Sequence, residues 1–207
     1  MSVAEKMTAI ADAISGKTGK TEKLSLDEMA TEINEISTGE RDINPEWTDW
    51  RYFSYYDNRN DLVAKLKYND TSKGTDFSRM FYYCISLTSI PQLDTSNGTN
   101  FNSMFYYCSK LTSIPQLDTS KGTDFTRTFY YCSALVDLNI VGTINAIGLN
   151  VSYSTLLSHD SLMSIINALA DKTGVSGTFK VTLGSTNLAK LTADEIAIAE
   201  GKGWTLA

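Results

Sequence analysis

The sequence has few of the residues that most often build reactive or metal-binding sites. Its 207 residues include one histidine and three cysteines, which cannot complete a Cys/His zinc set. An odd number of cysteines also excludes a framework in which every cysteine is paired. No apolar run approaches the ~18 residues of a membrane-spanning helix, so we expect no membrane insertion.

Basic charge is also scarce. The chain has 18 Lys and Arg against 24 Asp and Glu, a formal net charge of −6 and a pI near 4.8. Proteins that bind nucleic acid through its phosphates usually carry a basic patch, so we do not expect nucleic acid as a partner. The first residues, "MSVAEKMTAIADAISGK", show no basic segment followed by an apolar run. We therefore expect no signal peptide and synthesis as a soluble chain in the cytoplasm.

The sequence does contain a repeat with a period of 24 residues. The aligned positions are Phe77, Phe101 and Phe125; Phe81, Phe105 and Phe129; Cys84, Cys108 and Cys132; Leu87, Leu111 and Leu135; Ile90, Ile114 and Leu138; Asp70, Asp94 and Asp118. Residues 70–141 hold three clear repeats, and residues 46–69 hold a degenerate one with Phe53, Val63 and Leu66 at the same positions. A fixed period of this length indicates a solenoid, whose units bury their apolar faces by stacking.

Each repeat divides into three short segments. Phe77, Met80, Phe81 and Cys84 are spaced as on one face of a helix, which predicts a helix of about two turns. "LTSIPQL" predicts a short strand that pairs with its copies, and "DTSNGT" predicts a turn. We therefore expect an α/β solenoid of short helices and strands, in which the cysteines are small apolar core residues.

The repeat "DTSNGTNFNSMFYYCSKLTSIPQL" resembles the leucine-rich repeats of BspA-like bacterial surface proteins. Similar repeats occur in tail proteins of phages that infect Gram-positive bacteria. The resemblance covers residues 70–141, about a third of the chain. It is specific for the fold and does not imply one function.

Residues 1–41 predict two amphipathic helices. Val3, Met7, Ile10 and Ile14 form a heptad-like stripe, and Ser25 with Glu28 predicts the start of a second helix. The helices either cap the solenoid or use the first stripe to join chains or dock on an assembly. Residues 9–36 also resemble a helical element of phage tail and baseplate proteins.

Residues 142–207 predict a continuation and cap of the solenoid, after repeats that span 42–141. Ser158 can cap a helix, "GTFKVTLG" reads as a strand, Thr192 and Glu195 form a capping box, and "WTLA" can add a last strand. The segment that begins "LSHDSLMSIINALADKTG" also resembles the ends of phage tail proteins that carry these repeats.

Two motifs suggest chemistry, but structural explanations account for both. Ser158, His159 and Asp160 are the residue types of a hydrolase triad, yet adjacent residues at a helix start point in different directions. "DTSKGTD" alternates oxygen-bearing side chains but lacks the acidic ligands of a calcium loop. We therefore expect no enzyme activity, no cofactor and no metal site.

The tyrosine pair of each repeat is the candidate ligand-binding feature. With the apolar residues turned inward, one tyrosine of each pair points outward and the other lies at a flank. The candidates are Tyr82, Tyr83, Tyr106, Tyr107, Tyr130 and Tyr131. Such rows suit contact with sugars or protein, although each ring could instead pack against the next coil.

The resemblances to phage tail proteins, together with the lack of a signal peptide and of catalytic groups, imply a non-enzymatic component of a phage tail or baseplate, such as a tail fibre or receptor-binding protein located in the virion. Its expected partners are other tail proteins and a host-surface glycan or protein, and a homotrimer is the favoured oligomer. The alternative is a BspA-like bacterial surface adhesin, which would need an export signal or wall anchor.

Overall fold

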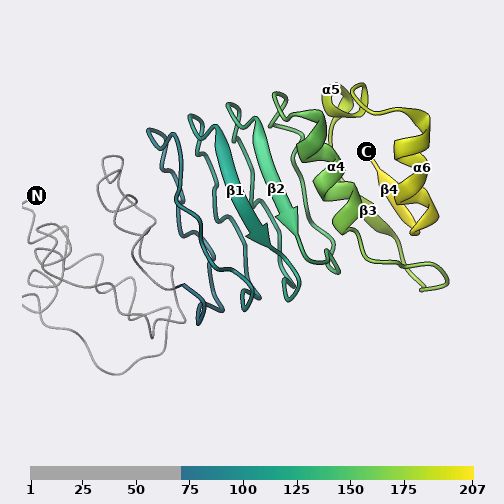
Figure 1. Ribbon diagram of the computed structural model, residues 1–207, viewed down its shortest axis with the longest axis horizontal. Coiled ribbons are helices and arrows are strands. Elements are labelled where there is room, and N and C mark those ends of the chain that lie inside the picture. The colour runs from purple at the N-terminus through teal and green to yellow at the C-terminus, as the bar shows by residue number, and fades with distance from the viewer. Residues whose placement is uncertain (1–70) are drawn as a thin grey trace, which may run out of the picture. The chain divides into compact units, whose positions relative to one another are not determined.

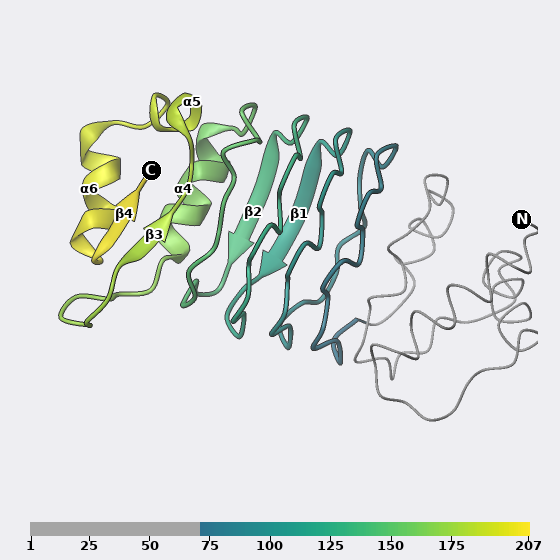
Figure 2. The same ribbon diagram turned by 180° about the vertical axis from the view of Figure 1, so that it is seen from behind.

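The computed structural model describes residues 71–207. The elements are β1 (Ser113–Asp118), β2 (Asp137–Val141), α4 (His159–Ala168), β3 (Phe179–Val181), α5 (Ser185–Leu188), α6 (Ala193–Gly201) and β4 (Trp204–Leu206). Figures 1 and 2 show the coils of residues 71–141 side by side, with the helices following at the C-terminal end. The predicted amphipathic helices, the stripe of Val3, Met7, Ile10 and Ile14, and the degenerate repeat lie outside the described residues.

Successive coils are joined by parallel backbone pairing. On one side, Asp76 bridges Asn100, which bridges Asp124. On the other side, β1 pairs in parallel with β2, and Ile114 lies opposite Leu138, 24 residues later. The segment "LTSIPQL" therefore pairs with the equivalent segment of the adjacent coil, as the sequence predicts.

The short helix predicted for residues 77–84 is wrong. These residues form successive turns, in which the amides of Met80 and Cys84 donate to the carbonyls of Phe77 and Phe81, three residues earlier. Arg79 and Tyr83 have φ values of 57° and 60°, as the third residue of a type II turn requires. A helix cannot form because the intervening amides bond to carbonyls of the next coil instead of to their own chain four residues back.

The core nevertheless contains the residues that the periodicity selects. Phe77, Met80 and Phe81 are fully buried, and the equivalent side chains of the next two coils are buried as well. The phenylalanines stack on their copies with centroid separations of 5.3–5.9 Å and nearly parallel planes. Two successive turns therefore bury the same residues that the expected helix would have buried.

The predicted turn at "DTSNGT" is confirmed by its hydrogen bonds. The Asp94 carboxylate accepts a bond of 3.0 Å from the Ser96 amide, which is typical of an Asx turn. The buried Thr95 hydroxyl donates to the Asp118 carbonyl of the next coil at 3.0 Å. This threonine therefore ties adjacent coils together beside the turn.

After β2, the helix α4 covers the edge of the strand with serine hydroxyls. The Leu138 amide donates to the Ser161 hydroxyl at 2.8 Å, and the Ser164 hydroxyl donates to the Leu138 carbonyl at 3.0 Å. Ser158 caps α4, as predicted. The side chains of α4 thus satisfy backbone groups of β2 that a further strand would otherwise bond.

The final elements follow the predicted order, with one addition. The capping box of Thr192 and Glu195 begins α6, and β4 pairs in parallel with β3. The buried Trp204 indole donates to the Ala170 carbonyl at 2.7 Å. The short helix α5 was not predicted; its Asn187 is buried and donates to carbonyls of the preceding coil.

Candidate binding face

The candidate tyrosines form two stacked rows on one side of the coils. In the first row, Tyr106 lies between Tyr82 and Tyr130, with ring centroids 4.8 and 5.1 Å apart. In the second row, Tyr83, Tyr107, Tyr131 and Tyr153 follow one another at 4.9, 4.5 and 4.4 Å. We call these seven residues the tyrosine face.

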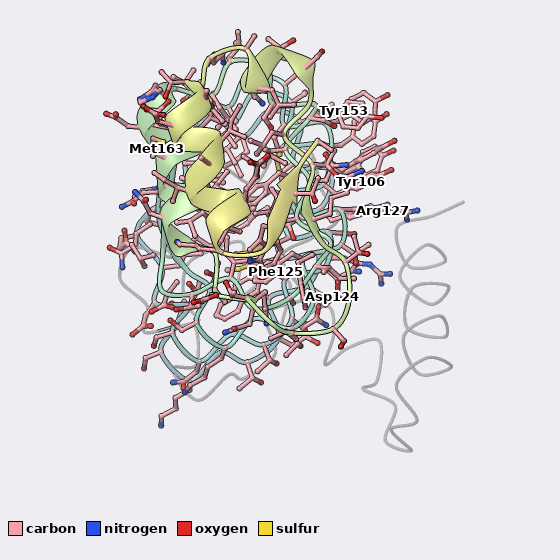
Figure 3. The ribbon with its side chains drawn as sticks, turned by 90° about the vertical axis from the view of Figure 1, so that its right-hand side faces the viewer. Tyr106, Asp124, Phe125, Arg127, Tyr153 and Met163 are labelled. Atoms are coloured by element: carbon pink, nitrogen blue, oxygen red, sulfur yellow. The ribbon has the colours of Figure 1, made fainter. Side chains whose placement is uncertain are left out.

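The rings both pack between coils and remain accessible, so the two alternatives of the sequence analysis coexist. Tyr83 is 46% exposed and Tyr153 is 37% exposed, while the other rings are half-buried. Figure 3 shows Tyr106 and Tyr153 projecting from the same side of the ribbon. Because stacking covers the ring faces, the surface offers ring edges and phenol oxygens to a ligand.

The backbone under the second row is strained. Tyr83, Tyr107 and Tyr131 have φ values of 58–60°, a conformation that costs a non-glycine residue about 1–2 kcal/mol. Each stacked aromatic pair stabilises the folded protein by about 0.5–1.5 kcal/mol. Stacking between coils therefore offsets the strain, and the tyrosines are held at regular intervals.

Arginine accompanies the tyrosines in alternate coils. Arg79 and Arg127 are exposed and occupy the same coil position, with φ values of 57° and 58°. The intervening coil has Ser103 there, which is buried. Figure 3 shows Arg127 on the same side as Tyr106 and Tyr153. Within residues 71–207, neither guanidinium makes a hydrogen bond or an ion pair.

One carboxylate on this side is already engaged in hydrogen bonds. Asp124 accepts bonds from the Thr126 amide at 2.8 Å and from the Asn102 side chain at 3.2 Å. Burial opposes ionisation of Asp124, but these bonds outweigh it and lower the pKa of the carboxyl. The Asp124 carboxylate is therefore charged and already hydrogen-bonded within the protein, whereas the two arginine side chains can bind a ligand.

The phenols interact strongly at the C-terminal end of the rows. Hydrogen bonding to Tyr130, together with the charge of that phenol and burial, raises the pKa of Tyr153 to about 12. Burial and the neighbouring phenols also raise the pKa of Tyr107. Tyr107 and Tyr153 are therefore neutral phenols over the physiological pH range.

Sequence reasoning missed Tyr153, which extends the second row. Tyr153 does not follow the period of 24, so the alignment of repeats skips it. A shift of 26 residues places "NVSYS" on "DFTRT", and Asn150 accepts a bond from the amide two residues on, as Asp124 does. Tyr153 therefore stands at the coil position of Arg127.

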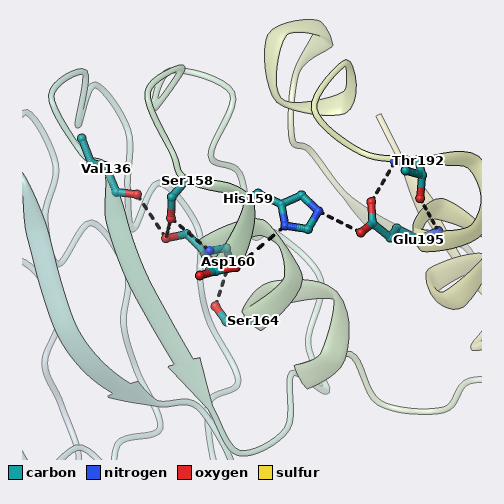
Figure 4. A network of polar contacts seen from close by, with 8 residues as sticks. Val136, Ser158, His159, Asp160, Ser164, Thr192 and Glu195 are labelled. Carbon is teal, nitrogen blue, oxygen red and sulfur yellow. Dashed lines mark hydrogen bonds and ion pairs between the residues drawn. The ribbon is translucent and has the colours of Figure 1, made fainter.

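The Ser158, His159 and Asp160 triplet does not assemble into a triad. The Ser158 oxygen lies 3.2 Å from the Ser161 amide, which it caps, and 2.8 Å from the Ser161 hydroxyl. His159 Nε2 instead contacts a carboxylate oxygen of Glu195 at 2.8 Å and so links α4 to α6 (Figure 4). An Asp160 carboxylate oxygen lies 3.8 Å from His159 Nδ1, which is too long for a hydrogen bond. The other contacts of the triplet are those of a helix start and an interhelical pair.

No group of three or more metal-ligating side chains occurs within residues 71–207, and no helix of that region has the length and apolarity to cross a membrane.

Residues 51–145, just under half of the chain, match a protein family described as "Mycoplasma protein of unknown function, DUF285". No curated protein and no solved structure matches the chain.

Proposed function

We propose that this chain is a non-enzymatic structural component of a phage tail or baseplate, a tail fibre or receptor-binding protein that attaches to the host cell through the tyrosine face. The observation that carries the binding role is the repetition of partly exposed tyrosines at equivalent positions of successive coils. The virion role is supported by the resemblance of residues 9–36 and of the segment from Leu157 onward to phage tail proteins.

The proposal also covers the architecture of the repeats, a leucine-rich-repeat solenoid. The parallel pairing at 24-residue intervals and the stacked phenylalanines support an α/β solenoid of leucine-rich repeats, built here from turns and strands in residues 71–141. The stripe of Val3, Met7, Ile10 and Ile14 would join subunits, with a trimer favoured, or dock on other tail proteins. The ligand would be a glycan or a protein of the host surface.

Mass spectrometry of purified particles and an adsorption assay test this proposal. The chain should be present in the virion, and an excess of purified chain should block adsorption of the phage to its host. A variant with serine at Tyr82, Tyr106 and Tyr130 should block at least tenfold less well. The matched variant with phenylalanine at these positions keeps the stacking and reports the contribution of the hydroxyls alone. Absence of the chain from particles would overturn the virion role.

The alternative is a BspA-like bacterial surface adhesin that binds protein or glycan. The description of the matching family names a protein of Mycoplasma, a bacterium, and no function; it therefore favours a bacterial over a phage origin. Fractionation of bacteria that carry the gene distinguishes the two. An adhesin is found on the surface of cells that contain no phage, whereas a tail component is found in particles.

A further inference from the structure

We propose that the tyrosine face binds a linear acidic glycan that runs along the row of coils and carries one carboxylate per disaccharide. This inference rests on the proposed attachment function and specifies its ligand. It follows from three properties of the face: which parts of the rings are accessible, how far apart they lie, and where the unpaired positive charges are.

The accessible parts of the rings favour a hydroxyl-rich ligand. Neighbouring rings of the first row are inclined by only 8° and 9°, so each covers the faces of the next. A flat aromatic or a sugar ring cannot insert between rings whose centroids are about 5 Å apart without separating the coils. The accessible groups are phenol oxygens, which donate and accept hydrogen bonds, and these match the hydroxyls of a sugar polymer.

The spacing favours a polymer over a single small molecule. The second row presents four rings at successive separations of 4.4–4.9 Å. Each step is close to the length of one sugar residue in an extended chain. A glycan lying along the row can therefore contact one phenol with each sugar residue. Once the first contact has formed, the others form within the same complex, so that many weak contacts together give a higher affinity.

The charges favour one anionic group per two sugar residues. Arg79 and Arg127 lie two coils apart, which is about 10 Å at the ~4.8 Å spacing of paired strands. The intervening Ser103 is buried and neutral. A guanidinium binds a carboxylate with two parallel hydrogen bonds, and neither arginine has a partner within residues 71–207. A glycan with alternating acidic and neutral residues matches this alternation.

Calorimetry of the full chain with hyaluronan and heparosan oligosaccharides tests the proposal, because both polymers alternate glucuronate with N-acetylglucosamine. We expect binding that weakens with added salt and strengthens with length until the oligosaccharide spans the four rings of the second row. The carboxyl-reduced polymer should bind at least tenfold more weakly. Polyglutamate, which has the charge but no sugar hydroxyls, should also bind at least tenfold more weakly.

Two sets of variants locate the binding. Arg79→Asn combined with Arg127→Asn removes both charges, and asparagine tolerates the positive φ of these positions. This variant should bind at least tenfold more weakly, and Tyr106→Phe with Tyr107→Phe should weaken binding several-fold while preserving the stack. Lys180→Asn in β3 removes one positive charge elsewhere and should bind like the wild type.

Absence of binding to both acidic polymers, equal binding of the carboxyl-reduced polymer or of polyglutamate, or an unchanged affinity of the arginine variant would each overturn the inference. The result is independent of the virion role. A chain that is absent from particles can still bind the glycan, and a chain present in particles can fail to bind it.

Discussion

At the scale of single residues, the glycine of the repeat turn is fixed by a phenylalanine of the core. A Cβ at Gly98 would lie 2.5 Å from the ring of Phe101, and one at Gly122 would clash with Phe125. Gly98→Ala should therefore destabilise the protein by about 1–3 kcal/mol, as overpacking does. Urea unfolding followed by circular dichroism measures the change.

Gly201 provides the matched control, because a Cβ there meets no atom within 4 Å and the residue ends α6. Gly201→Ala should leave stability unchanged or raise it by up to about 1 kcal/mol. If both substitutions have the same effect, the close approach of Gly98 to Phe101 does not constrain the turn.

The cysteines give a second prediction at this scale. Cys108 and Cys132 are fully buried, and burial raises the pKa of both thiols, that of Cys132 to about 12. Relative to an ordinary thiol pKa of 9.0, the thiolate fraction of Cys132 falls roughly a thousandfold. Native protein at mildly alkaline pH should resist iodoacetamide, and urea should expose all three cysteines to it. Mass spectrometry counts the labels; rapid native labelling of Cys132 would contradict its burial.

The buried residues could be predicted from the sequence, but their backbone could not. Phe77, Met80, Phe81 and Cys84 satisfy a helical period, and a pair of turns buries the same set. The deciding feature is the positive φ of Arg79 and Tyr83. Glycine is the residue that signals this conformation, and these positions contain none.

At the scale of elements, the capping box of α6 supports both the helix and its contact with α4. The Thr192 hydroxyl accepts a bond from the Glu195 amide, and the Glu195 carboxylate accepts one from the Thr192 amide. Thr192→Ala should cost about 1 kcal/mol, measured by thermal unfolding. Thr192→Ser, which can accept the same bond, is the control and should restore most of the stability.

Glu195 also makes the stability depend on pH. Hydrogen bonds from Thr192, and then the contact with His159, lower the pKa of this carboxyl. Its folded pKa lies below its unfolded value near ~4.3, so the stabilisation is full above that value and is lost as the pH falls through the folded pKa. Glu195→Gln keeps a side chain that can accept the capping bond but removes the charge.

Wild type should therefore be more stable than the Glu195→Gln variant at neutral pH, and the difference should disappear in acid. Urea unfolding at several pH values measures the difference. A difference that stays constant down to strongly acidic pH would show that the charge of Glu195 is not the cause.

Helices with a local signal and the strands that pair with their own copies were predicted correctly, whereas the turns of residues 77–84 were not. The starts of α4 and α6 could be predicted from Ser158 and from the Thr192–Glu195 capping box, because capping depends only on a few neighbouring residues. The turns of residues 77–84 depend on amides that bond to the next coil. A single repeat contains no information about that partner.

At the scale of the whole molecule, translation of one coil onto the next generates the candidate site. Equivalent positions in stacked coils place Tyr82, Tyr106 and Tyr130 in line, so the period alone predicts a row. The period cannot reveal that the rings cover each other, that Arg79 and Arg127 flank them, or that Tyr153 extends them. These properties depend on side-chain direction and on a coil that departs from the repeat.

If stability is the sum of similar coils and their contacts, removal of one complete repeat should be tolerated. Deleting residues 95–118 joins Asp94 to Thr119, which is the natural neighbour of the equivalent Asp118. This variant should unfold cooperatively, with a urea m-value smaller in proportion to the lost surface. Deleting residues 95–106 places Asp94 beside Tyr107 and should abolish cooperative unfolding, because turns would face strands. Circular dichroism in urea measures both variants, and equal behaviour would show that the 24-residue coil is not the unit of folding.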